Sequence, residues 1–238
     1  MADKNVAKVA IASDFLNAFA NIPKKQQGKV LEFITKFKAN PLASSINYEK
    51  IIQFKDPTLR SVRIDQSYRG IVKKPDSGNV FMLLWVDHHD KAYKWAANKK
   101  CTINPETGSL QIYDVDDSQS NEKKINVSDQ KQKTDSLFSS IKDKHLLKLG
   151  VPGDLLAMVR SICTEDQLDK ATQCMPAEAG EALTAIAAGY TLEEVFRDLD
   201  KINKDEQTVD IDDYEKALHN PDTKRRFFVV EDDLILQE

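Results

Sequence analysis

The sequence predicts an α+β domain followed by a small all-helical domain. Apolar residues recur at helical spacing early in the chain, alternating runs then indicate strands up to residue 113, and beyond residue 136 the period is helical alone. Residues 114–135 are polar and nearly free of large apolar groups, which is typical of a flexible linker. We therefore expect an α+β domain at 1–113, a linker at 114–135, a helical bundle at 136–204 and a mixed tail at 205–238.

The chain should begin with a strand and two helices. Val6–Ala12 alternates weakly and predicts the strand. Asp14–Ala39 predicts a helical hairpin that restarts at Pro23, because apolar residues of its second half repeat at i, i+3, i+4 and i+7. An Asn-Pro pair ends the second helix. A further short helix is expected near Tyr48–Phe54.

Three strands should then form a small sheet. Val62 and Ile64 alternate with charged residues, as in a half-buried strand, and Arg69–Lys74 predicts the next strand. A Pro-Asp-Ser-Gly turn leads into Asn79–Val86. That segment is apolar almost throughout, so it should be a central strand covered on both faces.

The remaining signals are shorter. Asp90–Asn98 predicts a short helix, and Thr102–Tyr113 predicts a hairpin around an Asn-Pro-Glu-Thr-Gly turn. Residues 136–204 predict a bundle of short amphipathic helices. In the tail, Asp210–His219 predicts a helix and Phe227–Val230 a strand, and residues 234–238 resemble the start of another helix.

Charge is distributed unevenly along the chain. Residues 1–100 hold 18 Lys and Arg against 9 Asp and Glu, a net charge of +9, whereas residues 101–238 hold 16 against 29, a net charge of -13. A basic first part suits a polyanionic partner such as RNA or DNA. The alternative is a solvated basic surface, or one that docks on the acidic part of the same chain.

Several classes of protein are excluded or disfavoured. No apolar run approaches the roughly 20 residues that span a bilayer, and the first residues lack the apolar core of a signal peptide. Three widely spaced cysteines fit a reducing cytoplasm and form no disulfide framework. Gly28-Lys29 lacks the other residues of a phosphate-binding loop, so we expect no nucleotide hydrolysis within these residues and no cofactor.

The segment Ser61–Asn98 carries the groups that cleave RNA without a metal. Such cleavage needs a base for the ribose 2′-hydroxyl, an acid for the leaving oxygen and cations for the phosphorane charge. Histidine, tyrosine and arginine can supply these functions. The candidate catalytic residues are Arg63, Arg69, His88, His89 and Tyr93, and the candidate nucleic-acid contacts are Lys50, Lys55, Arg60, Lys73, Lys74 and Lys91.

A metal site and purely structural roles are the competing interpretations. Adjacent residues of a strand point to opposite faces, so His88 and His89 should not chelate one ion together, and no metal is expected. Arg63 could instead be the polar face of a strand, and Tyr68 and Tyr93 could be core aromatics. His89 could simply cap the helix that follows.

The order of elements, with a Tyr-Arg-Gly motif, a hairpin and a histidine five residues before a tyrosine, resembles the RelE/ParE toxin superfamily of toxin–antitoxin systems. The resemblance covers residues 1–98 and implies a small twisted antiparallel sheet packed on an N-terminal helical hairpin. RelE-type members cut mRNA in the ribosomal A site, and ParE-type members inhibit gyrase. It also implies functional roles for Arg63, Arg69, His88 and Tyr93.

A narrower resemblance covers nearly the whole chain. The segments LRSVRIDQSYRGIVKKP, LLWVDHHDKAYKWA and RRFFVVEDD resemble the region ahead of the motor in bacterial UvrD/Rep-like DNA helicases with a RelE-like N-terminal domain. This implies a helicase core after residue 238. His88-His89 replaces the His-Arg of many toxins, and Asp65, Asp87 and Asp90 add negative charge. These differences favour a repurposed toxin fold.

Three functions follow as expectations. The first is a RelE-like nucleic-acid-binding module of a UvrD-like helicase-type protein, with residual ribosome-dependent mRNA cleavage. The second is a non-catalytic module that binds RNA, DNA or the ribosome. The third is a ParE-like toxin directed at gyrase. The acidic second part of the chain is a candidate neutralising partner in cis.

Overall fold

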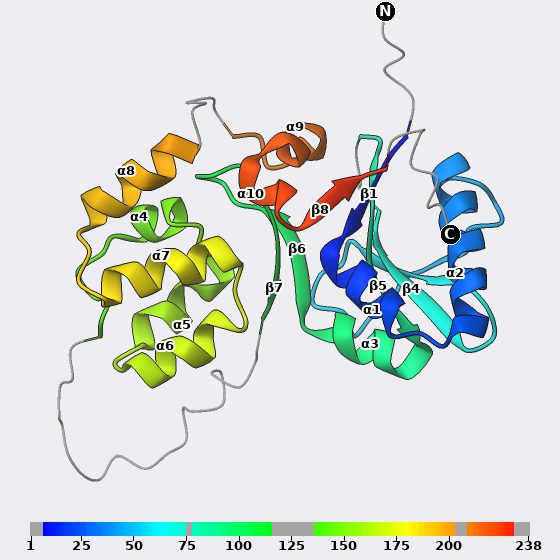
Figure 1. Ribbon diagram of the computed structural model, residues 1–238, viewed down its shortest axis with the longest axis horizontal. Helices are drawn as coiled ribbons and strands as arrows, with labels where there is room; N and C mark the ends of the chain where they lie inside the picture. Colours follow the sequence, from blue (N-terminus) through cyan, green and yellow to red (C-terminus); the bar gives the residue numbers. More distant parts are fainter. Residues whose placement is uncertain (1–6, 75–77, 116–135, 203–208, 231–238) are drawn as a thin grey trace, which may run out of the picture. The chain divides into compact units, whose positions relative to one another are not determined.

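The computed structural model describes residues 7–74, 78–115, 136–202 and 209–230 (Figure 1). The chain forms two compact units. Unit 1 comprises residues 1–99 and 212–238, and unit 2 comprises residues 100–211. Most of the expected linker and the expected helix start at residues 234–238 lie outside the described residues.

Unit 1 is built on a six-stranded mixed sheet with the strand order β2-β3-β4-β5-β1-β8. The strands are β1 (Lys8–Ala12), β2 (Tyr48–Glu49), β3 (Leu59–Arg63), β4 (Tyr68–Lys73), β5 (Val80–His88) and β8 (Phe227–Val229). β1 runs parallel to β5, with Ile11 opposite Leu83, whereas the other pairs are antiparallel. The expected antiparallel sheet is therefore wrong at this pair. The helical hairpin and three strands lie between β1 and β5, so the chain has room for the crossover that parallel pairing needs.

The two expected N-terminal helices are confirmed as α1 (Ser13–Ala20) and α2 (Lys24–Ala39). Their apolar residues pack against the sheet in one buried cluster. Phe37 is central to it, because its ring centroid lies 5.5 Å from that of Phe33 and 6.3 Å from that of Phe81 on β5. The helical hairpin thus covers one face of the sheet.

Helix α3 (His89–Ala97) follows β5 directly and confirms the short helix expected there. Its buried residues are Ala92 and Ala96, whose small side chains let the helix lie close to its neighbours. Trp95 stacks on Trp85 of β5, with 5.0 Å between ring centroids and 10° between ring planes. This contact holds α3 beside the end of the sheet.

The expected helix near Tyr48–Phe54 is wrong. Strand β2 occupies Tyr48–Glu49, and turns follow it. Tyr48 pairs with Val62 of β3 and packs against the core of unit 1, and its hydroxyl donates to the Pro41 carbonyl at 2.7 Å. These long-range contacts outweigh the weak local helix preference.

The tail of the chain completes unit 1. Helix α9 (Tyr214–His219) and helix α10 (Pro221–Lys224) precede β8, which pairs antiparallel with β1 so that Phe228 lies opposite Ile11. Asn220 caps α10 by accepting from the backbone N–H groups of Asp222 and Thr223. The expected strand in the tail is confirmed, and it belongs to the first unit.

Unit 2 combines a β-hairpin with helices. Its elements are β6 (Lys99–Ile103), β7 (Leu110–Asp114), α4 (Asp143–Lys148), the 3-10 helix η3 (Gly153–Leu155), α5 (Leu156–Ser161), α6 (Glu165–Thr172), α7 (Ala177–Ala187) and α8 (Leu192–Ile202). Tyr113 of the hairpin lies in the same buried cluster as Phe138 and Leu183. The elements described between residues 136 and 202 are helical, but the β-hairpin packs with them, so unit 2 is not all-helical. Among the described helices, none combines the length and apolarity that a membrane span requires.

A buried polar contact joins the hairpin to the helices of unit 2. The side-chain amide of Gln111 donates to the Gly150 carbonyl at 2.7 Å and to the Glu178 carboxylate at 3.0 Å. Ser109 also donates to Glu178, at 3.3 Å. Gln111 and Ser109 are fully buried, so these bonds satisfy groups that water cannot reach. The contact explains why the hairpin joins unit 2 instead of the expected domain at residues 1–113.

Candidate nucleic-acid interface

Five aromatic side chains form a continuous row in unit 1, here called the ring row. Tyr68 of β4 lies beside His88 at the end of β5, with 6.1 Å between ring centroids. The next centroid distances are 5.9 Å from His88 to His89, 5.3 Å from His89 to Tyr93 and 5.8 Å from Tyr93 to Phe54. The row therefore joins two strands, helix α3 and the segment after β2.

The junction between β5 and α3 creates this row. His88 is the last strand residue, with φ -53° and ψ 143°, and His89 is the first helical one. The His89 N–H donates to the Ser67 carbonyl at 2.8 Å, which ties the junction to the turn before β4. His89 and Tyr93 are four residues apart on the helix, so they share a face.

Carboxylates accompany the imidazoles. The Nδ1 atom of His89 lies 3.0 Å from the Asp90 carboxylate, and that of His88 lies 4.0 Å from it. The Tyr93 hydroxyl donates to Glu49 at 3.3 Å. The imidazoles of His88 and His89 are 49% and 44% exposed, so a ligand in solution can reach both.

The prediction that His88 and His89 point to opposite faces is wrong. Alternation holds along a continuous strand, but here the chain turns into a helix between the two residues. Their rings and the Asp90 carboxylate consequently gather in one place. The strand periodicity did not reveal where β5 would end.

The two candidate arginines lie apart from His88. Arg63 pairs with Arg69 across β3 and β4, and Arg69 pairs with Asp87 of β5, whereas Tyr68 pairs with His88. Because neighbouring residues of a strand alternate, the arginines lie on the opposite face from Tyr68 and His88. Arg63 is exposed there and can meet an anion.

Arg69 is unsuited to the phosphate contact expected of it. It is only 9% exposed, and its Nη1 donates to the Asp65 and Tyr68 carbonyls at 3.0 and 3.1 Å. One terminal nitrogen of the guanidinium is thus committed to the turn between β3 and β4. In this position Arg69 stabilises the turn between β3 and β4.

The candidate nucleic-acid contacts also differ in how exposed their side chains are and in whether these already have partners. Lys73 is 2% exposed and forms an ion pair with Asp56, so its assignment to nucleic acid is withdrawn. Arg60 donates to the Pro57 and Leu59 carbonyls at 2.6 and 2.9 Å. The remaining candidates keep surface area: Lys50 and Lys91 are exposed, and Lys55 and Lys74 are half-buried.

Asp65 organises the turn between β3 and β4, which leads into Tyr68 of the ring row. Burial alone would raise its pKa, but hydrogen bonds from the Tyr68 N–H, the Lys29 ammonium and the Ser67 N–H outweigh burial and hold the pKa below its usual value. The three donors lie 2.8, 3.0 and 2.7 Å from the carboxylate oxygens. The ionised carboxylate therefore stabilises the fold.

Asp65→Asn should lower the free energy of unfolding of unit 1 at neutral pH. It should also make that free energy depend less on pH in the acid range. A carboxyl group with a lowered folded-state pKa stabilises the fold above its unfolded-state pKa, and this stability is lost as the pH falls through the folded-state value. The difference in unfolding free energy between wild type and variant should therefore be larger at pH 7 than at pH 3. Urea unfolding followed by tryptophan fluorescence measures it. Lys29→Met should show part of the same effect, and a difference independent of pH would contradict the assignment.

Sequence reasoning missed three members of this region. Phe54 was expected in a helix, Tyr68 was interpreted as a core aromatic, and Glu49 carried no signal. Each is placed by strand pairing or by contact with α3, over sequence separations that local patterns do not cover. Of these three residues, only Tyr68 could have been found from the sequence, by looking for a tyrosine that lies opposite His88 in the neighbouring strand.

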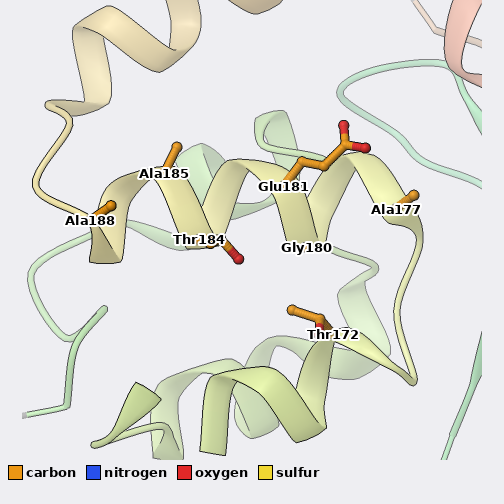
Figure 2. A pocket seen from close by; sticks show the side chains of 7 residues that line it. All are labelled: Thr172, Ala177, Gly180, Glu181, Thr184, Ala185 and Ala188. Atoms are coloured by element: carbon orange, nitrogen blue, oxygen red, sulfur yellow. The ribbon is translucent and has the colours of Figure 1, made fainter. Parts of the chain in front are cut away.

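Unit 2 has a hollow between α6 and α7 of about 570 Å³. Figure 2 shows Thr172 facing α7 across it, with Gly180 and Thr184 on the opposite wall. Three alanines and Glu181 complete the lining. The lining residues include no imidazole, thiol or cation, so this hollow does not supply the chemistry described above.

No protein-family model and no curated protein matches the chain. Among solved structures, the chain is similar to the RelB–RelE antitoxin–toxin complex from Methanococcus jannaschii, at 16% identity and a TM-score of 0.30, over 36% of this chain and 95% of that one. It is also similar to the archaeal RelE–RelB complex from Pyrococcus horikoshii OT3, at 22% identity and a TM-score of 0.30, over 37% of this chain and 99% of that one. Similarity this weak leaves the function to be argued from the site.

Proposed function

We propose that unit 1 is a nucleic-acid-binding module that holds unpaired RNA bases against the ring row. The ring row is the observation that carries the proposal. Bases stack on aromatic side chains with little regard to sequence, and each stacked base contributes about 1–3 kcal/mol. His88, His89 and Tyr93 offer such surfaces along one edge of the unit.

Charges around the row support a polyanionic ligand. Lys91 is exposed on the same helix as Tyr93, and the exposed Lys50 follows β2. Such cations neutralise phosphates and make binding sensitive to salt. Asp90 and Glu49 oppose an anion nearby, so we expect moderate affinity.

Metal-free RNA cleavage is the second candidate function. The Asp90 carboxylate beside His89 Nδ1 can orient that imidazole as a general base, and Tyr93 lies next to it. Arg69 is turned into the backbone, and Arg63 lies on the sheet face opposite His88. The cation that cleavage needs is therefore the weaker part of this candidate, and binding is the stronger proposal.

The wider setting follows from the sequence resemblances. We place this module in the cytoplasm, ahead of a helicase core of the UvrD type, where it would bring RNA, DNA or the ribosome to the motor. A gyrase-directed toxin of the ParE type is the alternative partner assignment. The nucleic-acid experiment separates these, since a gyrase-directed module need not bind single-stranded RNA.

Tyr93→Leu should weaken binding of a fluorescent single-stranded RNA by about 5- to 100-fold, because one stacked base is lost. Fluorescence anisotropy at several salt concentrations measures the affinity, with single-stranded DNA as the comparison. Tyr190→Leu is the matched control, since Tyr190 is 60% exposed in unit 2 and should leave affinity unchanged.

Two results would count against these functions. Equal affinity of wild type, Tyr93→Leu and Tyr190→Leu, at unchanged thermal stability, would remove the ring row from RNA binding. The bound RNA is also recovered and run on a denaturing gel, with and without translating ribosomes. Intact RNA in every lane would exclude cleavage, whereas fragments lost in His89→Gln would establish it.

A further inference from the structure

We propose that His88, His89 and Asp90 form a binding site for a divalent transition-metal ion such as Zn²⁺. One ring nitrogen from each imidazole and one Asp90 oxygen all lie within 4.8 Å of one another. Neutral imidazole and carboxylate are ligands that Zn²⁺ accepts. The inference is independent of RNA binding, because it rests on these three side chains alone.

The distances are close to those of an occupied site. Ligands at 2.0–2.1 Å from a tetrahedral zinc ion lie about 3.3 Å apart. The separations are 3.0 Å from His89 Nδ1 to Asp90 Oδ1 and 4.0 Å from His88 Nδ1 to Asp90 Oδ2, on either side of that value. Rotations of exposed side chains would close the remaining gap without moving the backbone.

The backbone favours this convergence. The strand ends at His88 and the helix begins at His89, so consecutive side chains turn toward a common point. The hydrogen bond from the His89 N–H to the Ser67 carbonyl fixes the junction. The three ligands therefore come from a constrained segment, which reduces the conformational entropy lost on binding.

The surrounding charges set the expected strength. Asp87, whose carboxylate accepts from the His88 N–H at 2.7 Å, adds negative charge beside the site and favours a cation. Lys91 and the positive end of α3 oppose it. Three protein ligands leave a fourth position for water or an anionic oxygen, as in zinc sites that bind substrate.

Zn²⁺ titration of the full, untagged chain by isothermal calorimetry tests the site, without any nucleic acid present. We expect saturable binding that weakens by about tenfold or more in His89→Gln and in Asp90→Asn. Co²⁺ substitution should give visible d–d absorption whose intensity falls in the same variants. His145→Gln and His219→Gln, which change the other two histidines of the chain, are the matched controls.

Each outcome decides the proposal. Binding lost in His88→Gln, His89→Gln and Asp90→Asn but kept in the controls supports it. Binding unchanged in all variants would assign the ion to the cysteines or another place and overturn it. If the wild type does not bind Zn²⁺, the proposal is overturned and Asp90 is only the partner of His89. The RNA affinity is measured separately and does not depend on this result.

Discussion

Lys73→Met should lower the free energy of unfolding of unit 1 by about 3–5 kcal/mol, because it leaves a buried carboxylate without its cation. The side chains of Lys73 and Asp56 are 2% and 5% exposed, and their charged atoms lie 3.6 Å apart. Lys73 also donates to the Thr58 hydroxyl at 2.7 Å. A loss of this size is a large share of the 5–15 kcal/mol typical of a domain.

Urea unfolding followed by tryptophan fluorescence measures this effect. The chain has two tryptophans, Trp85 and Trp95, and both lie in unit 1. Lys74→Met is the matched control: Lys74 is half-buried with its ammonium 5.0 Å from the centre of the Tyr48 ring, and its loss should cost about 1 kcal/mol or less.

The double variant Lys73→Met with Asp56→Asn tests the cause. Asparagine keeps the oxygen that accepts from the Thr58 N–H at 2.9 Å but removes the buried charge. The double variant should therefore be more stable than Lys73→Met alone. If the two substitutions simply add, the ion pair is not what holds Lys73 in place.

Gly150→Ala should destabilise unit 2 by about 2–4 kcal/mol, as the sum of backbone strain and overpacking. Gly150 has φ +91°, and a Cβ atom there would lie 2.8 Å from the Glu178 Cγ atom. The clash would push Glu178 away from Gln111 and Ser109, which depend on it for their buried hydrogen bonds.

Gly189→Ala separates the two contributions. Gly189 has φ +99°, but a Cβ atom there would meet nothing within 4 Å, so only the backbone strain of about 1–2 kcal/mol remains. Amide hydrogen exchange of peptides from α4 and α7, read by mass spectrometry, measures both variants. Equal protection in the two would show that the contact with Glu178 contributes nothing.

Local pattern was sufficient for much of the fold. The helical hairpin and α3 follow from apolar spacing because each helix buries one stripe, and the central strand follows from a continuous apolar run because both of its faces are buried. The pairing of β1 with β5 and β8 could not be predicted in this way. It joins residues up to 219 positions apart, such as Ala10 and Val229.

The candidate site shows the same division. His88, His89 and Tyr93 were found from residue chemistry, and the structure gathers them. Lys73 was expected to contact nucleic acid, and only the structure shows that its side chain is buried beside Asp56. Buried ion pairs depend on tertiary contacts, which composition and alternation do not encode.

The strand order of unit 1 has a consequence for synthesis of the chain. Proteins emerge from the ribosome N-terminus first. β1 is made before β5 and all of unit 2, yet its neighbour β8 is made only after all of unit 2. During translation β1 therefore has an unpaired edge, a template for wrong association. This edge of β1 stays unpaired until Phe227–Val229 has been synthesised. Strand β8 then pairs with β1 and covers the edge, after the other described strands of unit 1 have already been made.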